Sequence, residues 1–269
     1  MKTERLHAVS VEIGCYGRSA WASAHSVTGN ASGRIIRESA ISFWVNLVVR
    51  RSTGLFSLPT PSDSPSIVIP GPDPDRILLI GSGLVTGSGV ASHAVGAGGH
   101  LARFISAETV RGVALDVVPI PSLLIRFAPL HLAQLDLRSY NALILVVGLN
   151  DAFIATSRRA WRRGLEKALV QAKKGMAPRG RVFLVLIADP TQSPLFRNRP
   201  ARWALARGRV LNLESRQVIK NDPDVTVIGF EIGLPSGGYR LYDSSSYLRW
   251  ARQLGPQVVG SLLRSRSGR

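Results

Sequence analysis

The chain has 269 residues, which suffices for one large domain or two small ones at about 150 residues per domain. Hydrophobic residues make up 45% of it and charged residues 19%, so a wholly disordered or collagen-like protein is excluded. The 34 basic residues exceed the 17 acidic ones and give a net charge of +17. This charge predicts weak, non-specific binding to nucleic acid or to an anionic membrane surface, and the single cysteine excludes an internal disulfide.

Residues 1–75 predict an N-terminal extension that is partly disordered. Ser, Ala and Gly dominate residues 19–33, and prolines recur across residues 59–74, which is typical of a linker. Between them, apolar side chains at helical spacing predict one short helix at about 35–51. No apolar run is long enough for a membrane-spanning helix, and the first residues lack the apolar core of a secretory signal peptide. We therefore expect a cytoplasmic location.

From residue 76 to residue 269, short apolar runs alternate with helical patterns, which predicts an α/β domain that ends in a short basic tail. The apolar runs show no alternation with polar residues, as expected for parallel strands that helices cover on both faces. The predicted architecture is therefore a doubly wound sandwich. The predicted strands are 76–80, 114–120, 142–147, 181–187 and 225–230, and the predicted helices are about 91–110, 129–138, 157–175, 199–220 and 244–264.

Two glycine-containing turns follow the first and third predicted strands, where open α/β sheets bind their ligands. The first turn begins at Gly81, and the second spans 148–151. A Rossmann-type nucleotide-binding protein is one alternative, since Gly81-x-Gly83 precedes a helix whose amino end suits a pyrophosphate. However, the second predicted strand ends without the carboxylate that holds the ribose hydroxyls in such proteins.

Together the two turns resemble motifs of the SGNH (GDSL-like) hydrolases. Residues 80–84 (Ile-Gly-Ser-Gly-Leu) resemble the Gly-Asp-Ser-Leu block that opens the family, and residues 148–151 (Gly-Leu-Asn-Asp) resemble its third block. The ending Tyr-x-x-Trp-Ala at 247–251 agrees, so the resemblance covers about 76–263. It implies a flavodoxin-like three-layer sandwich whose five parallel strands lie in the order 2-1-3-4-5. It also implies the activities of esterases, lipases, acyltransferases and carbohydrate deacetylases, with no cofactor.

The resemblance assigns the family's catalytic groups to positions that lack them. The nucleophilic serine corresponds to Gly83, and the aspartate before it corresponds to Ser82. The glycine that helps to form the oxyanion hole falls on Pro121 or Ser122, and a proline cannot donate a backbone hydrogen bond. The oxyanion-hole asparagine of the family is retained as Asn150.

The catalytic base is missing as well. Aligned on the ending at 247–251, the family's histidine falls near Leu241 and its aspartate near Gly238, and a register shifted to Asp243 recovers only the aspartate. No histidine follows residue 131. A serine nucleophile needs a base within hydrogen-bond reach, so we expect a degenerate pseudo-esterase that acts as a binding or interaction module.

An active esterase or acyl hydrolase with a rearranged site is the alternative. There Ser82 or Ser88 would be the nucleophile and His93 the base, although the degenerate reading places His93 and His100 on a helix surface. In the degenerate protein, the same turns would bind a small acyl or sugar-ester ligand, or their polar side chains would only cap loops and helices. The candidate ligand-contacting residues are Gly81, Ser82, Gly83, Ser122, Gly148, Asn150, Asp151 and Asp189, and no metal ligand is expected.

Overall fold

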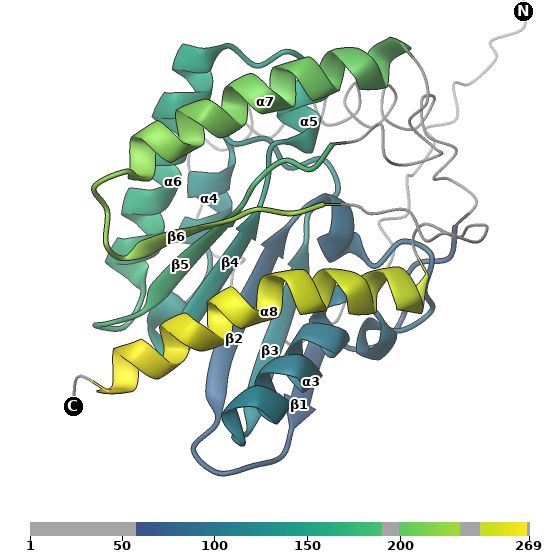
Figure 1. Cartoon of the computed structure of the whole chain (residues 1–269), viewed down its shortest axis with the longest axis vertical. Helices are drawn as coiled ribbons and strands as arrows, with labels where there is room; N and C mark the ends of the chain where they lie inside the picture. Colours follow the sequence, from purple (N-terminus) through teal and green to yellow (C-terminus); the bar gives the residue numbers. More distant parts are fainter. Residues whose placement is uncertain (1–57, 190–198, 232–242, 268–269) are drawn as a thin grey trace, which may run out of the picture.

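The structure is a computed structural model that describes residues 58–189, 199–231 and 243–267 (Figure 1). One sheet of six strands runs through it in the order β1-β3-β2-β4-β5-β6. The strands are β1 (Ser66–Ile69), β2 (Asp75–Gly81), β3 (Val113–Pro119), β4 (Ala142–Val146), β5 (Arg181–Val185) and β6 (Val225–Ile228). The helix predicted at 35–51 and the predicted disorder near the N-terminus lie outside the described residues.

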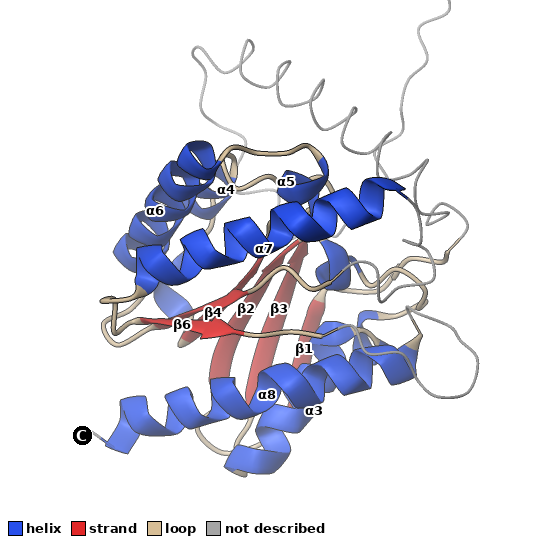
Figure 2. Ribbon diagram, turned by 45° about the horizontal axis from the view of Figure 1, so that its top comes forward, coloured by secondary structure: helices blue, strands red, loops and turns tan. Residues whose placement is uncertain are grey.

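Helices form a layer on each face of the sheet (Figure 2). One layer holds α3 (Ala97–Thr109) and α8 (Ser244–Ser267), which contact each other closely. The opposite layer holds α4 (Ala128–Ala133), α5 (Leu149–Phe153), α6 (Arg158–Gly175) and α7 (Arg199–Ile219). In the connections of the described segments lie the 3-10 helices η2 (Gly83–Thr86), η3 (His93–Val95) and η4 (Leu137–Ser139). Within the described ranges, no helix is long and apolar enough to cross a bilayer.

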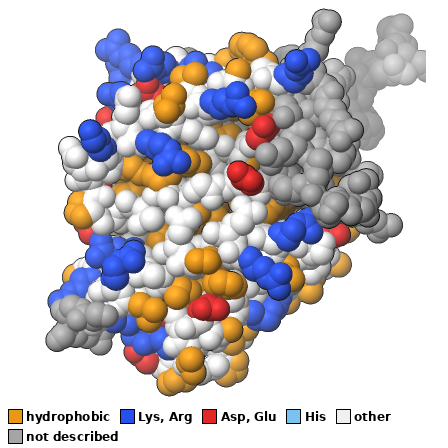
Figure 3. All heavy atoms as spheres, viewed as in Figure 1, with side chains coloured by type: hydrophobic (Ala, Val, Ile, Leu, Met, Phe, Trp, Pro, Cys, Tyr) orange, Lys and Arg blue, Asp and Glu red, His pale blue; other side chains and the backbone are white. Residues whose placement is uncertain are grey.

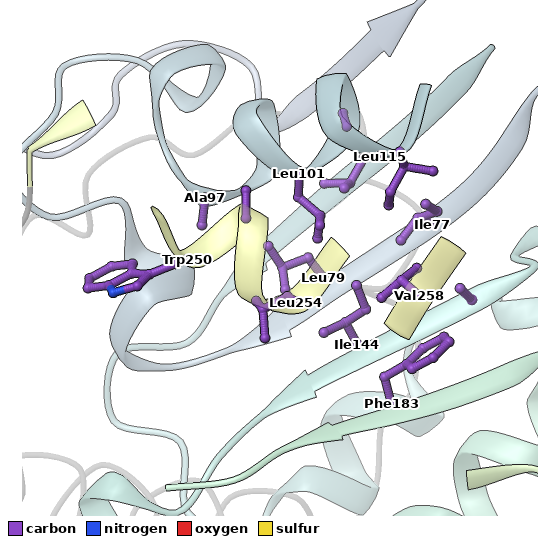
Figure 4. Close-up of a cluster of buried hydrophobic side chains, with 14 of the residues drawn as sticks. Ile77, Leu79, Ala97, Leu101, Leu115, Ile144, Phe183, Trp250, Leu254 and Val258 are labelled. Atoms are coloured by element: carbon purple, nitrogen blue, oxygen red, sulfur yellow. The ribbon is translucent and has the colours of Figure 1, made fainter. Parts of the chain in front are cut away.

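The central strands contribute side chains to two hydrophobic cores, one on each face of the sheet. In β2, Ile77 and Leu79 pack toward α3 and α8, whereas Leu78 and Ile80 pack toward α4, α6 and α7. Figure 4 shows the first of these cores, in which Leu254 of α8 lies against the sheet beside Leu79. Successive side chains of a strand point to opposite faces, so a sheet covered on both faces needs apolar residues at every position. This is why the strand sequences lack polar alternation.

The predicted fold is confirmed, with one added strand. The five parallel strands lie in the order β3-β2-β4-β5-β6, which is the predicted 2-1-3-4-5. The sixth strand, β1, pairs antiparallel with β3 and comes from the segment 59–74 that we expected to be a linker. Three β-branched residues between Pro65 and Pro70 form this edge strand, and Ile67 is buried.

The helices agree with the prediction except near two caps. The helix expected at 91–110 begins only at Ala97, because η3 precedes it. The helix expected at 129–138 divides into α4 and η4, because the Asp136 side chain accepts a hydrogen bond from the Arg138 backbone and starts a new turn. The long helices α6, α7 and α8 match their predicted ranges within a few residues.

Candidate functional site

The turn after β2 is fixed against two neighbouring strands. Gly81 has φ +146°, and a Cβ there would lie 1.9 Å from the Val146 carbonyl oxygen, so only glycine fits. The Ser82 amide donates to that same oxygen at 3.0 Å, and the Gly81 carbonyl accepts from Ile120 at 2.7 Å. The turn therefore lies at the carboxyl end of the sheet, where α/β proteins bind ligands.

Position 83 presents backbone only. Gly83 begins η2 with φ +62°, and a Cβ on it would meet no atom of the described residues within 4 Å, its chain neighbours aside. The serine one position earlier does not compensate, because Ser82 is only 3% exposed. The place that the family resemblance gives to the nucleophile is thus open space beside a buried hydroxyl.

The rest of the turn is bonded internally and to α8. The Thr86 hydroxyl donates to the Gly83 carbonyl and lies 2.8 Å from the Ser88 hydroxyl. The Tyr247 hydroxyl of α8 donates to the Ser88 carbonyl at 2.8 Å. Tyr247 in turn packs edge-on against Trp250, so two residues of the motif at 247–251 hold the turn in place.

The sequence predicted that His93 lies on a helix surface, and this prediction is wrong because the residue is buried. It is 3% exposed, its Nε2 atom has no hydrogen-bond partner among the described residues, and burial lowers the pKa of its imidazole. Its backbone amide and the Ser92 hydroxyl both donate to the Asp63 carboxylate, which binds the segment 58–63 over this part of the chain. In the described part of the molecule, no hydrogen bond joins the His93 ring to Ser82 or Ser88.

Asn150 uses its side-chain amide to hold a neighbouring loop. Its Nδ2 atom donates to the carbonyl oxygens of Pro121 at 2.9 Å and of Leu123 at 3.0 Å, and the residue is 3% exposed. An asparagine amide has two N–H groups, and both are used here. Donating to an oxyanion would require breaking one of these bonds.

Asp151 ties two further connections together. Its carboxylate accepts from the Ile125 amide at 3.0 Å and from the Thr156 hydroxyl at 2.8 Å, and the residue is 1% exposed. Burial raises the pKa of this carboxyl to about 6, although both hydrogen bonds favour the ionised form. The sequence left two roles open for this side chain, ligand binding and the capping of loops. The observed contacts are those of a loop cap.

The remaining candidates surround this centre. Gly148 has φ +115°, and a Cβ there would lie 2.7 Å from both Ile187 and Trp161, so the turn requires glycine. Ser122 is half-buried in the connection that Asn150 holds, and Asp189 is half-buried beyond the end of β5. The structure thus brings together the segments 81–83, 121–123 and 148–151.

The C-terminal block contributes a helix cap. Asp243 accepts from the Ser246 amide and from the Ser245 hydroxyl, each at 2.8 Å, at the start of α8. Burial would raise the pKa of Asp243, but these hydrogen bonds outweigh it and hold that pKa below its ordinary value. Leu241 and Gly238 lie outside the described residues.

One serine–histidine contact had no signal in the sequence, since its partners are 144 positions apart. His100 Nε2 lies 2.9 Å from the Ser244 hydroxyl, and Arg103 Nη2 lies 3.2 Å from His100 Nδ1. Arginine can only donate, so Nδ1 accepts and the proton of the neutral ring sits on Nε2. Burial and the charge of Arg103 both lower the pKa of the His100 imidazole, which favours its neutral form. A catalytic base needs the opposite tautomer, with Nε2 free to accept the serine proton.

Comparison with protein-family models and with curated proteins gave no match. Solved structures do match. Est24, a carbohydrate acetylesterase from Sinorhizobium meliloti, has a TM-score of 0.51 and 13% identity over 69% of this chain and 99% of that one. The native aryl esterase of M. smegmatis has a TM-score of 0.51 and 15% identity over the same shares. A candidate GDSL-like lipase from Bacteroides ovatus reaches a TM-score of 0.53 and 15% identity over 75% of this chain and 55% of that one.

The chain has the SGNH-hydrolase fold. At these identities the likeness is one of architecture, and the residues of the SGNH-like domain must be judged by their own contacts. Gly83 has no side chain to act as a nucleophile, and the amide of Asn150 is already hydrogen-bonded to two backbone carbonyls. The carboxylate of Asp243 caps helix α8. Across the described ranges, no group of three or more His, Cys, Asp or Glu side chains is arranged to hold a metal ion.

Proposed function

We propose that this SGNH-like domain is catalytically degenerate and acts as a binding or interaction module. The observation that carries the proposal is Gly83, which offers no hydroxyl at the position where the family resemblance places the nucleophile. Acyl transfer by a serine enzyme requires a nucleophile and a base that act as a unit. Without them, only the weak catalysis of binding and oxyanion stabilisation would remain.

The second support is the state of the groups that would assist a nucleophile. The amide of Asn150 is bonded to two backbone carbonyls, and the Ser244–His100 contact has the tautomer that does not activate a serine. The rival function, an esterase with a rearranged site, needs His93 to reach Ser82 or Ser88. The buried His93 ring makes no such hydrogen bond in the described structure.

For the ligand of such a binding module, we propose a small acyl or sugar-ester group that binds at the same turn. Among the described residues, no atom beyond the chain neighbours of Gly83 lies within 4 Å of a Cβ placed there, so a ligand group would lie against the backbone at this position. A small acyl or sugar-ester group is the ligand chemistry that fits a site of this descent. Its polar contacts would come from backbone groups, because the Asn150 and Asp151 side chains are engaged elsewhere.

The test measures ester hydrolysis and serine reactivity together. We expect no turnover of p-nitrophenyl acetate or butyrate above buffer, and no labelling of Ser82 or Ser88 by a fluorophosphonate probe. Gly83→Ser should fold, since the added Cβ meets no described atom within 4 Å and costs about 1 kcal/mol for the positive φ. It should stay inactive, because the sequence has no histidine after residue 131 to serve as the base. Gly83→Ala is the matched control, with the same backbone cost and no hydroxyl.

One result would overturn the proposal. Stoichiometric labelling of the unmodified protein at Ser82 or Ser88, abolished by His93→Ala, would establish the rearranged hydrolase instead.

A further inference from the structure

Helix α7 turns its only acidic residue inward. Glu214 is 2% exposed and is paired with Arg158 and Arg162 of the neighbouring helix α6. The hydrogen bond with Arg162, and next that with Arg158, lowers the pKa of the Glu214 carboxyl. The carboxylate is therefore ionised at neutral pH, and the two arginines balance its charge. The outward side of α7 therefore carries basic and apolar side chains without a carboxylate.

The outward side of α7 has a basic edge and an apolar edge. Arg202, Arg209 and Arg216 are exposed and lie seven residues apart, so at 100° per residue they fall within about 40° of one another. Trp203 and Leu213 occupy the adjoining arc and are 59% and 62% exposed. Figure 3 shows Lys and Arg side chains interspersed with hydrophobic ones over the surface where Figure 1 places α7.

A surface with these two edges matches the interface of an anionic bilayer. Tryptophan prefers the headgroup level of a membrane, where its ring is apolar on one side and wet on the other. Arginines beside it attract anionic headgroups, and the three of them extend over about 21 Å of helix. A second copy of the same surface would oppose like charges, and nucleic acid would leave the exposed Leu213 without an apolar partner.

We propose that the outward face of α7, formed by Arg202, Trp203, Arg209, Leu213 and Arg216, binds anionic phospholipid membranes. Trp203 and Leu213 enter the headgroup region, and the three arginines supply the attraction to lipid phosphates. The domain then lies on the membrane surface through one helix of its outer layer. This binding is separate from the turn at Gly83, which belongs to the carboxyl end of the sheet.

The test uses the full chain and vesicles of phosphatidylcholine and phosphatidylserine in a roughly 2:1 ratio. The triple variant Arg202→Gln, Arg209→Gln, Arg216→Gln should lower the vesicle partition coefficient by about 100-fold, which is about 1 kcal/mol for each arginine. Trp203→Ser should weaken binding and remove the blue shift of tryptophan fluorescence. Vesicles of pure phosphatidylcholine should bind poorly, and raised salt should weaken binding to the anionic ones.

The matched control is a triple variant that replaces three exposed arginines away from α7, Arg138→Gln, Arg252→Gln and Arg264→Gln. It should bind the anionic vesicles nearly as well as the unmodified protein does. A second control, Trp44→Ser, alters the apolar segment at 41–49. Equal losses in both triple variants would reduce the effect to net charge and overturn the proposal. So would a loss confined to Trp44→Ser, or α7 variants that lose binding to duplex DNA while keeping their affinity for vesicles.

Discussion

Asp151 shows how a single buried carboxylate can bind loops together and still cost stability. Its pKa in the folded chain is about 6, above the ordinary 3.8, so the folded state binds a proton more tightly than the unfolded state does between these values. The contribution of Asp151 to stability is therefore greatest below pH 3.8 and falls as the pH rises toward 6. Above that pH the loss is complete and constant, at about 3 kcal/mol.

The prediction for Asp151 is a change in pH dependence. In Asp151→Asn the amide oxygen can still accept from Ile125, and the amide nitrogen can donate to the Thr156 hydroxyl, so the packing should persist. The free energy of unfolding, measured by urea denaturation from pH 3.5 to pH 7, should lose the decline that Asp151 causes. The variant should match or exceed the unmodified protein at pH 7. A variant less stable at pH 7, with an unchanged pH profile, would contradict this assignment.

At the scale of elements, Asn150 joins the first turn of α5 to the connection between β3 and α4. Asn150→Ala leaves the carbonyl of the buried Leu123 without its donor, at about 1–3 kcal/mol, and also removes the hydrogen bond to the carbonyl of the exposed Pro121, which costs less. We expect a loss of about 2–4 kcal/mol in the free energy of unfolding. Gln134→Ala, at an exposed position after α4, serves as the control and should change little. Full stability of Asn150→Ala would mean that the amide is free for another task.

The sequence predicted elements well where hydrophobicity alone decides them. The strands of the parallel sheet are apolar at every position because both faces are covered, and that pattern is legible without a structure. Strand β1 was missed because its four residues lie between prolines and pair only along one edge. The division of α4 from η4 depends on one aspartate cap, which competes with a helical pattern that continues through it.

The sequence motifs predicted where two turns lie, and the ligand-binding role of these turns stays a prediction. The turns at 81–83 and 148–151 follow β2 and β4 at the carboxyl end of the sheet, as expected. Whether the Asn150 amide is free depends on where the backbone of residues 121–123 passes, and no local pattern encodes that path. The buried state of His93 likewise depends on Asp63, which lies 30 residues away in a segment that reads as a linker.

At the scale of the whole molecule, a cluster of charges joins the start of β2 to the end of α8. Asp75 at the start of β2 is 1% exposed and is paired with Arg111 at 3.2 Å and with Arg266 of α8 at 2.8 Å. Arg266→Ala removes one charge-assisted hydrogen bond from a buried carboxylate and should cost about 2 kcal/mol. Arg264→Ala, two residues earlier and exposed, should cost much less. Thermal unfolding of both variants decides the point, and equal effects would refute a specific role for the Asp75 pair.

The two termini of the described domain lie at opposite ends of the strands. The segment 58–63 lies beside the turn after β2, where Pro59 accepts a hydrogen bond from Gly89. Helix α8 ends beside Asp75, at the amino end of β2 and so at the other end of the strands. A biosensor surface that holds the protein by a tag after residue 269 therefore presents the Gly83 turn to the solution. Attachment before residue 58 would place the tether next to that turn, where it competes with any analyte for access.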